Sequence, residues 1–239
     1  MKEINSFKKG IASGMPICIG YFSISFAFGI LAVQYGFSVF EAVLISLTNL
    51  TSAGQLAAVP IIATGGTLVE LAITQLVINS RYALMSVSLS QKLGKSITML
   101  DRFILSFGNT DEVFAVAVSN IGNVGKKYMY GLIIPPILGW TSGTLIGALA
   151  GDILPASITS ALSIAIYGMF IAIVVPIAKK ERSTGLCVLF AIALSCVFYY
   201  IPFLKNSVPG GFTIIICSVI ASAVFAFVAP VKTEVTQDE

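Results

Sequence analysis

The chain has 239 residues, of which 56% are hydrophobic and only 10% charged, with a formal net charge of +3 and a mean hydropathy of +0.95. This composition excludes a soluble globular domain and predicts an integral membrane protein whose single domain spans residues 1–239. Histidine is absent, which excludes the commonest metal ligand and leaves any proton transfer near neutral pH to carboxylates.

Continuous apolar segments, each long enough to cross about 30 Å of hydrocarbon, recur along the chain. They run over residues 14–34, 40–61, 66–90, 103–123, 128–150, 157–178, 185–204 and 210–230. Glycine, proline and charged residues separate them, and none alternates as a barrel strand would. The predicted fold class is therefore an all-α polytopic membrane protein with seven to eight hydrophobic helical segments, some of them broken or re-entrant.

The second segment is interrupted by a cluster of polar and small residues, SLTNLTSAGQ, at residues 46–55. Unwound backbone at membrane depth is tolerated only where it lines protein or a cavity. The amides, hydroxyls and glycine-exposed backbone of this cluster suit a substrate site, and close packing through small residues is the alternative. The candidate substrate-binding residues are Asn49, Ser52, Gly54, Gln55 and, from the third segment, Asn79.

The third segment carries a basic residue at its centre, Arg81 in the stretch INSRYA at residues 78–83. A charge at that depth costs roughly 2.5–3.5 kcal/mol on insertion scales, so Arg81 needs a partner. Asp111 and Glu112 are the candidate counter-ions, whereas Glu41 and Glu70 begin their segments and are expected to meet the interface. A purely structural ion pair is the alternative interpretation.

The fourth segment is interrupted at SFGNTDE, residues 106–112, where Asn109 or Thr110 is predicted to cap a new helix. From Thr110 to Asn123 such a helix is about 21 Å long, too short to span. On a helical wheel Asp111 faces a close-packed neighbour, whereas Glu112 faces a polar lane formed by Asn109, Val116, Ser119, Asn120 and Asn123.

These positions make Glu112, Asp111 and Arg81 the candidates for ion or proton coupling. The alternative for the two acids is that they only complement the dipole of the helix that begins there.

In membrane proteins lysine and arginine are enriched in cytoplasmic loops, so counting these residues on each side tests a proposed topology. If all eight segments cross, nine basic residues lie inside and four outside. If one stretch among the first three segments and the stretch 103–123 instead dip in and return, twelve lie inside and only Lys205 outside. The second arrangement fits the rule better, and both arrangements place the two termini in the cytoplasm.

Two further patterns concern packing and symmetry. The small-xxx-small spacing of Gly139, Gly143 and Gly147 indicates a helix-packing face. A weak half-chain repeat, about residues 1–120 and 121–230, is suggested by lysine, proline and glycine residues that recur at an offset of 118 or 119. The matching pairs are Lys8 and Lys126, Lys9 and Lys127, Pro16 and Pro135, Gly20 and Gly139, and Gly29 and Gly147.

Four motifs together resemble the AzlC family of branched-chain amino-acid permease subunits, which are linked to azaleucine resistance. They are Ser25–Gly29 in the first segment, Ala53–Gln55 in the second, Asn79–Tyr82 in the third and Asp111–Phe114 in the fourth. The resemblance implies export of valine, leucine or isoleucine across the cell membrane, together with a small AzlD-like membrane subunit.

The residues by themselves also agree with other functions. An ion channel or ion transporter could use the same Asp111, Glu112 and Arg81 cluster as a conduction lane or gate. An enzyme is not expected, because no P-loop, nucleophile elbow, zinc motif or dinucleotide fingerprint is present. We therefore expect no cofactor, no metal and no nucleic acid, and a lipid bilayer and a small-molecule substrate as partners.

Overall fold

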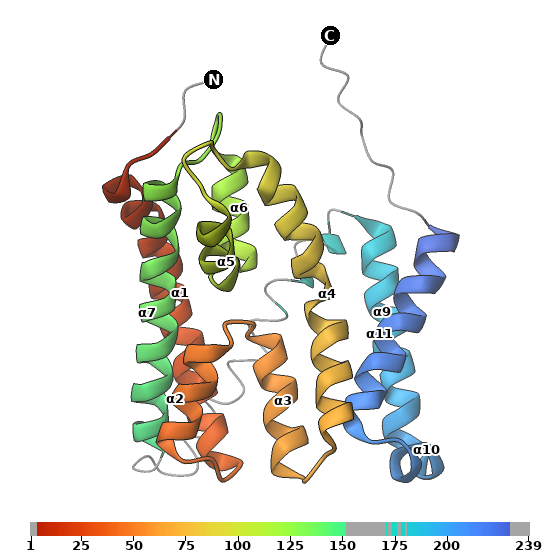
Figure 1. Cartoon of the computed structure of the whole chain (residues 1–239). Helices are drawn as coiled ribbons and strands as arrows, with labels where there is room; N and C mark the ends of the chain where they lie inside the picture. The colour runs from red at the N-terminus through yellow and green to blue at the C-terminus, as the bar shows by residue number, and fades with distance from the viewer. Residues whose placement is uncertain (1–3, 152–170, 172–173, 176–177, 180, 230–239) are drawn as a thin grey trace.

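The computed structural model describes residues 4–151, 171, 174–175, 178–179 and 181–229 (Figure 1). Within these ranges the secondary structure is helical, apart from two isolated bridges that join Val124 to Ile4 and Leu93. The structure therefore confirms an all-helical fold. The predicted segment 157–178 lies almost entirely outside the described residues.

Among the described helices, four are long and apolar enough to cross a membrane. They are α1 (Phe7–Gln34), α7 (Lys126–Gly151), α9 (Arg182–Tyr200) and α11 (Gly210–Val228). Helix α4 (Leu68–Lys92) has 25 residues and extends along the molecule beside them in Figure 1. Its polar residues, Arg81 among them, make it less hydrophobic than the other four.

The second predicted segment folds as a hairpin of two short helices, α2 (Val39–Thr48) and α3 (Ala53–Ala63). Ten and eleven helical residues rise about 15 Å each, which is half the thickness of a hydrocarbon core. In Figure 1 the hairpin starts at the lower end of the molecule, reaches its middle and returns to the same end.

The fourth predicted segment is a second hairpin, which enters from the opposite end (Figure 1). Its helices, α5 (Met99–Phe107) and α6 (Asp111–Ser119), have nine residues each. Both predicted interruptions are present, but they are narrower than 46–55 and 106–112. Helical hydrogen bonding continues through Thr48 and Phe107 and resumes at Ala53 and Asp111, so the breaks comprise only residues 49–52 and 108–110.

The core of the fold is the parallel pair α1 and α7, which lie side by side along their length (Figure 1). Glycines on α7 meet the backbone of α1 so closely that a side-chain carbon would collide with it. This confirms the packing face predicted for GWTSGTLIG, since small residues let helices in membranes approach closely. The contacting pairs are Gly131 with Gly10, Gly139 with Cys18, Gly143 with Phe22 and Gly147 with Phe26.

The C-terminal helices α9 and α11 are joined by α10 (Pro202–Ser207) and pack on each other. They contact the rest of the described structure through α4 and α3. Helix α1 begins and α11 ends at the same end of the molecule, as Figure 1 shows. The cytoplasmic location of that end stays a prediction.

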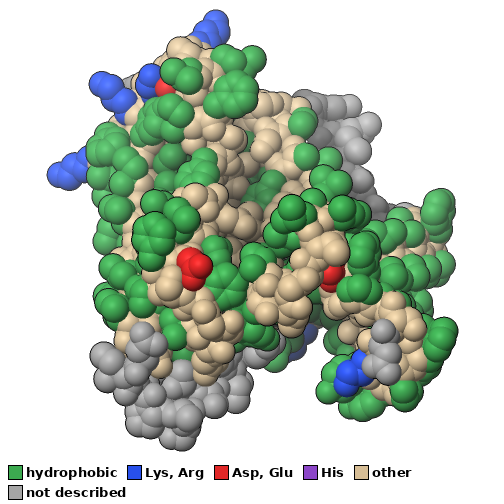
Figure 2. Space-filling model, turned by 60° about the horizontal axis from the view of Figure 1, so that its bottom comes forward, with side chains coloured by type: hydrophobic (Ala, Val, Ile, Leu, Met, Phe, Trp, Pro, Cys, Tyr) green, Lys and Arg blue, Asp and Glu red, His purple; other side chains and the backbone are tan. Residues whose placement is uncertain are grey.

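Basic residues lie mainly at this same end, where α1, α5, α7 and α9 begin and α4 finishes. Lys205 of α10 lies at the opposite end, which Figure 2 brings forward and which is covered largely by hydrophobic side chains. This separation has the form expected when the two interrupted segments dip in and return.

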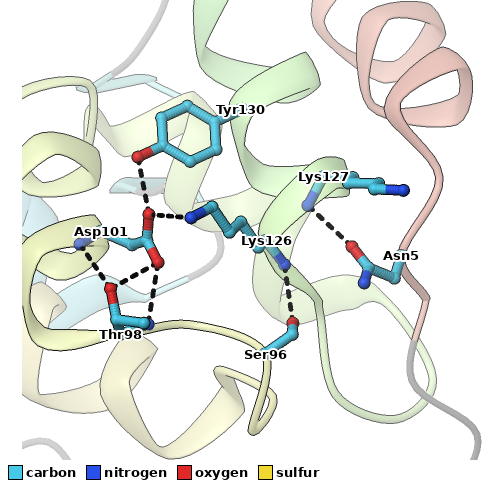
Figure 3. Close-up of polar contacts among 7 residues, drawn as sticks. All are labelled: Asn5, Ser96, Thr98, Asp101, Lys126, Lys127 and Tyr130. Atoms are coloured by element: carbon cyan, nitrogen blue, oxygen red, sulfur yellow. Dashed lines mark hydrogen bonds and ion pairs between the residues drawn. The ribbon is translucent and has the colours of Figure 1, made fainter.

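A polar network joins three chain segments at the basic end (Figure 3). Asp101 Oδ1 is 2.8 Å from Lys126 Nζ and accepts a hydrogen bond from the Tyr130 hydroxyl at 3.0 Å. The Lys126 and Lys127 backbone amides donate to Ser96 and Asn5. The network fixes the start of α7 against the start of α5 and against the N-terminal segment.

The half-chain repeat remains a prediction. Helices α1 and α7, which begin its two halves, are parallel in the structure. Most of the segment after α7, which would correspond to the first hairpin, lies outside the described residues.

Candidate functional site

The two breaks meet near the middle of the molecule, where a cavity of about 200 Å³ lies between them. Its residues come from the first break, from α4, from the end of α5 and from the second break: Leu50, Thr51, Tyr82, Ser106, Phe107, Asn109 and Thr110. Sites for drug-sized ligands measure about 300–1,000 Å³, so this cavity suits a smaller solute.

Polar groups of the first break form hydrogen bonds with one another. Asn49 Oδ1 accepts hydrogen bonds from the Thr51 backbone amide at 3.2 Å and from the Thr51 hydroxyl at 2.7 Å. Ser52 adopts φ of +28°, which L-residues rarely occupy, and its side chain does not cap α3. This strained turn reverses the chain and brings Leu50 and Thr51 to the cavity.

Gly54 and Asn79 lie together beside this break. The Gly54 carbonyl accepts a hydrogen bond from Gln75 Nε2 at 2.8 Å, and Gln75 Oε1 accepts one from Asn79 Nδ2 at 3.1 Å. A side-chain carbon on Gly54 would lie only 2.6 Å from Gln75 Oε1. The glycine thus allows α3 to approach α4, and Asn79 is linked to the break through Gln75.

The Gln55 side chain points away from the central cavity, toward α7. Its Nε2 donates to Ser46 Oγ at 3.2 Å, and Ser46 shares a 2.7 Å hydrogen bond with Thr144 of α7. All three side chains are fully buried. Gln55 therefore joins the first hairpin to α7 and does not line the central cavity.

The second break contains buried side-chain atoms that have no hydrogen-bond partner among the described residues. Thr110 occupies the predicted N-cap position of α6, but its side chain makes no capping hydrogen bond. Asn109 Nδ2 donates to Ser86 Oγ at 3.2 Å, while its Oδ1 has no hydrogen-bond partner among the described residues. Both residues are only 4% exposed. A sequence pattern typical of a cap has thus placed two polar residues at the cavity.

Arg81 pairs with Asp111, as predicted, with 2.5 Å between Nη1 and Oδ2. Both side chains are nearly half exposed, at 45% and 44%. Asp111 was expected to face a close-packed neighbour, and this was wrong, because α6 turns that side toward the guanidinium on α4. The Arg81 guanidinium also lies 5.0 Å from the centre of the Tyr82 ring, which lines the cavity.

Glu112 accepts a hydrogen bond from the Tyr21 hydroxyl of α1. Tyr21 packs edge-on against Trp140, with 5.2 Å between ring centres, and the two rings form one core cluster with Leu50, which lines the cavity. Of the predicted polar lane, Asn120 donates to the Val116 carbonyl of its own helix and to the Tyr128 hydroxyl, so the lane as a whole stays a prediction. Tyr21 carried no sequence signal, because it stands in an ordinary apolar run.

The three charged groups leave one formal negative charge in excess when both acids are ionised. Such a cluster favours uptake of a proton or of a cationic group such as an ammonium. Among the described residues no group of three potential metal ligands occurs. The four cysteines, Cys18, Cys187, Cys196 and Cys217, are free thiols.

Glu70 is an acid whose burial the sequence did not indicate. It was expected at the membrane interface, which stays a prediction, and the residue is only 5% exposed. Its Oε1 accepts a hydrogen bond from the Gly211 backbone amide at 2.9 Å. A carboxylate is stable there because Gly211 lies in the first turn of α11, whose amides lack helical partners.

A larger groove of about 690 Å³ lies along α9 and is apolar except for Arg182. It contains none of the charged residues of the cluster at the second break. Apolar surface of this kind is ordinary on a helix that faces lipid, so the smaller cavity is the better candidate for a polar solute.

Comparison with known proteins identifies a matching family model and several related sequences. The family model described as AzlC protein matches residues 16–154. An uncharacterized membrane protein of Archaeoglobus fulgidus is 34% identical over 178 residues, covering 74% of this chain and 78% of the relative. The inner membrane protein YgaZ of Escherichia coli is 31% identical over 195 residues, covering 78% of each chain. No solved structure matches this chain significantly.

Proposed function

We propose, because the chain belongs to the AzlC family, that this multi-pass membrane protein exports branched-chain amino acids such as valine, leucine or isoleucine. It works with a small AzlD-like membrane subunit in the cell membrane, and both of its termini are cytoplasmic. The observation that carries the proposal is the small cavity where the breaks of two opposed hairpins meet, next to an acidic cluster.

A branched-chain amino acid needs a donor for its carboxylate, an acceptor for its ammonium and an apolar surface. Arg81 provides a donor, Asp111 and Glu112 provide acceptors, and Leu50 and Phe107 provide apolar surface. The first break, with Asn49 and Ser52, shapes the wall of the cavity at Leu50 and Thr51. Gly54, Asn79 and Gln55 hold that wall in place, the first two through Gln75 of α4 and the third through Ser46 and Thr144. Discrimination between leucine and isoleucine is weak in such a site, because one methyl group contributes only about 1–3 kcal/mol.

Glu112 is the group that couples export to protons or binds the ammonium. It belongs to α6, which begins at the second break, and it accepts a hydrogen bond from Tyr21 of α1, the helix packed tightly against α7. Loss or gain of a proton on Glu112 therefore changes a bond between a hairpin and the core. Asp111 and Arg81 hold the same hairpin to α4.

The test is counterflow and proton-driven flux of labelled valine and leucine in proteoliposomes, with and without the small subunit. Glu112→Gln keeps the size of the side chain and removes its charge, so it should abolish proton-driven export while leaving expression unchanged. Glu41→Gln is the matched control, since Glu41 is exposed and bonds only within its own capping box.

If export and its pH dependence are unchanged in Glu112→Gln, then Glu112 only complements the dipole of α6 and does not couple export to protons. Current or ion flux that needs no amino acid would favour the ion channel or ion transporter, which uses the same cluster. The topology is tested separately with reporter fusions, and a C-terminus outside the cytoplasm would contradict it.

A further inference from the structure

The central cavity has a neighbour on the side of the basic end. This second cavity measures about 90 Å³ and lies between α4, α5 and the second break. Its lining residues are Ser86, Leu89, Ser90, Leu93, Arg102, Leu105, Ser106 and Asn109. Ser106 and Asn109 line both cavities, so these two residues form the partition between them.

The second cavity follows a polar strip toward the basic end. Ser86 and Ser90 are one turn apart on the same face of α4, and Arg102 lies in the first turn of α5. Ser90 and Ser106 donate to carbonyls of their own helices, at 2.6 and 2.7 Å. Ser86 is different, because its hydroxyl accepts from Asn109 across the gap between α4 and the second break.

The side-chain amide of Asn109 has one polar atom that is hydrogen-bonded and one that is not. One atom of its amide bonds to Ser86, and the other is buried and has no partner among the described residues. Because a serine hydroxyl can donate or accept, either orientation of the amide leaves one polar atom open. A buried polar atom without a partner is costly unless a ligand or water completes it.

We propose that Asn109 binds the solute in the central cavity through this open amide atom, and that its hydrogen bond to Ser86 closes the passage to the second cavity. The ligand is a solute of amino-acid size with a hydrogen-bonding polar end and a compact apolar part, as the polar and apolar walls of the cavity require. This identification of the ligand rests on the proposed function, whereas the closing bond does not.

The first arm of the experiment measures equilibrium binding of radiolabelled L-leucine to the purified protein. Asn109→Ala should raise the Kd about ten- to a hundredfold, the effect of losing one hydrogen bond to a charged group. Ser86→Ala should leave the Kd unchanged, because Ser86 lines the second cavity and not the central one. Ser90→Ala is the matched control, since Ser90 lines the second cavity without touching Asn109.

The second arm measures access to Thr51→Cys, which lines the central cavity, in a protein whose four native cysteines are replaced by alanine. A membrane-impermeant methanethiosulfonate is added from each face in turn. Ser86→Ala and Asn109→Ala should both speed labelling from the face where α4 ends, and Ser90→Ala should not. Labelling from the other face should stay the same.

The outcomes separate the two ideas. If the wild-type protein binds no branched-chain amino acid, the proposed function fails, and the labelling rates still decide whether Asn109 and Ser86 close the passage. Unchanged labelling in both variants overturns the closing bond. Unchanged leucine affinity in Asn109→Ala, with the wild-type protein binding normally, overturns the solute contact.

Discussion

The two hairpins share a plan and differ in what their breaks leave unpaired. Each begins with a capping box, Ser38 with Glu41 in α2 and Thr98 with Asp101 in α5. Each then reaches the middle of the molecule and turns back (Figure 1). A capping box satisfies the first amides of a helix, so both hairpins start from a fixed position.

The breaks themselves are unlike. In the first, Asn49 and Thr51 bond to each other and no residue is charged. In the second, Asn109 keeps an open polar atom, and Asp111 and Glu112 follow at once. The difference indicates that the first hairpin forms a wall of the cavity, while the second carries its changeable interactions with α1 and α4.

The largest expected effect is on the pair that holds the second hairpin to α4. Arg81→Ala leaves Asp111 without its cation and should lower amino-acid flux by about tenfold or more, the scale of one charged hydrogen bond. The double variant Arg81→Ala with Asp111→Ala should recover part of the flux, because neither charge then lacks a partner. Flux is measured in proteoliposomes at matched protein content.

A substitution in the first hairpin should lower the flux less than the loss of the pair that holds the second hairpin to α4. Asn49→Ala removes an uncharged contact within that break and should lower flux much less than Arg81→Ala does. A double variant that is no better than Arg81→Ala alone would mean that the loss of flux comes from the missing donor to the solute carboxylate and not from the unpaired Asp111.

The sequence predicted the parts of this comparison that depend on single segments. Charge distribution and polar clusters were sufficient to predict two interrupted segments, and the need for a counter-ion was sufficient to pair Arg81 with Asp111 or Glu112. These inferences succeed because the cost of a polar or charged group in hydrocarbon depends little on the rest of the fold.

What the sequence could not predict are the contacts between segments distant in the chain. Tyr21 meets Glu112 across 91 positions, and Gln55 reaches Thr144 of α7 through Ser46. A helical wheel gives the face of a residue but not the helix that covers it, which is why the partner of Glu112 on α1 could not be named. The burial of Glu70 depends likewise on where α11 begins.

Gly108 in the second break and Gly54 in the first turn of α3, just after the first break, should differ in their effect on stability. A side-chain carbon on Gly108 would lie 2.8 Å from Ile133 Cβ, which cannot rotate away, so Gly108→Ala should destabilise by about 1–3 kcal/mol. On Gly54 the carbon meets mainly amide and hydroxyl ends that can turn, so Gly54→Ala should cost about 1 kcal/mol, one hydrogen bond. The measurement is thermal unfolding in detergent.

Gly20→Ala is the control for this pair, because nothing lies within 4 Å of a carbon added there. It should be neutral or stabilising by roughly 0.5–1 kcal/mol, as alanine favours a helix interior. If Gly54→Ala proves more costly than Gly108→Ala, the first break is the more rigid of the two.

The starts of the hairpins should differ in their response to acid. Asp101 lies outside the apolar segment 103–123, and the Lys126 ammonium, followed by Thr98, holds the pKa of its carboxyl well below its usual range. A lowered pKa stabilises the fold above the ordinary value of about 3.9 and loses that contribution as the pH falls below it. Asp101→Asn should therefore lower the unfolding temperature at pH 7, and the difference from wild type should shrink below about pH 3.9.

Glu41→Gln in the first hairpin should cause a smaller fall at pH 7, because Glu41 bonds only to Ser38 and has no cation beside it among the described residues. Equal falls would show that the ion pair with Lys126 adds nothing to the capping box.

The smallest expected effect concerns the strained turn of the first hairpin. Ser52 has φ of +28°, and strain of this kind costs about 1–3 kcal/mol, of which glycine would relieve a part. Glycine also loosens the unfolded chain by roughly 0.5–1 kcal/mol, so Ser52→Gly should stabilise the protein by about 1 kcal/mol or less. Ser52→Ala keeps the side-chain carbon and loses a hydroxyl that makes no cap, so it should gain nothing. If the first hairpin is only a wall, amino-acid flux is unchanged in both variants, whereas a loss of flux in the more stable Ser52→Gly would show that the strain serves transport.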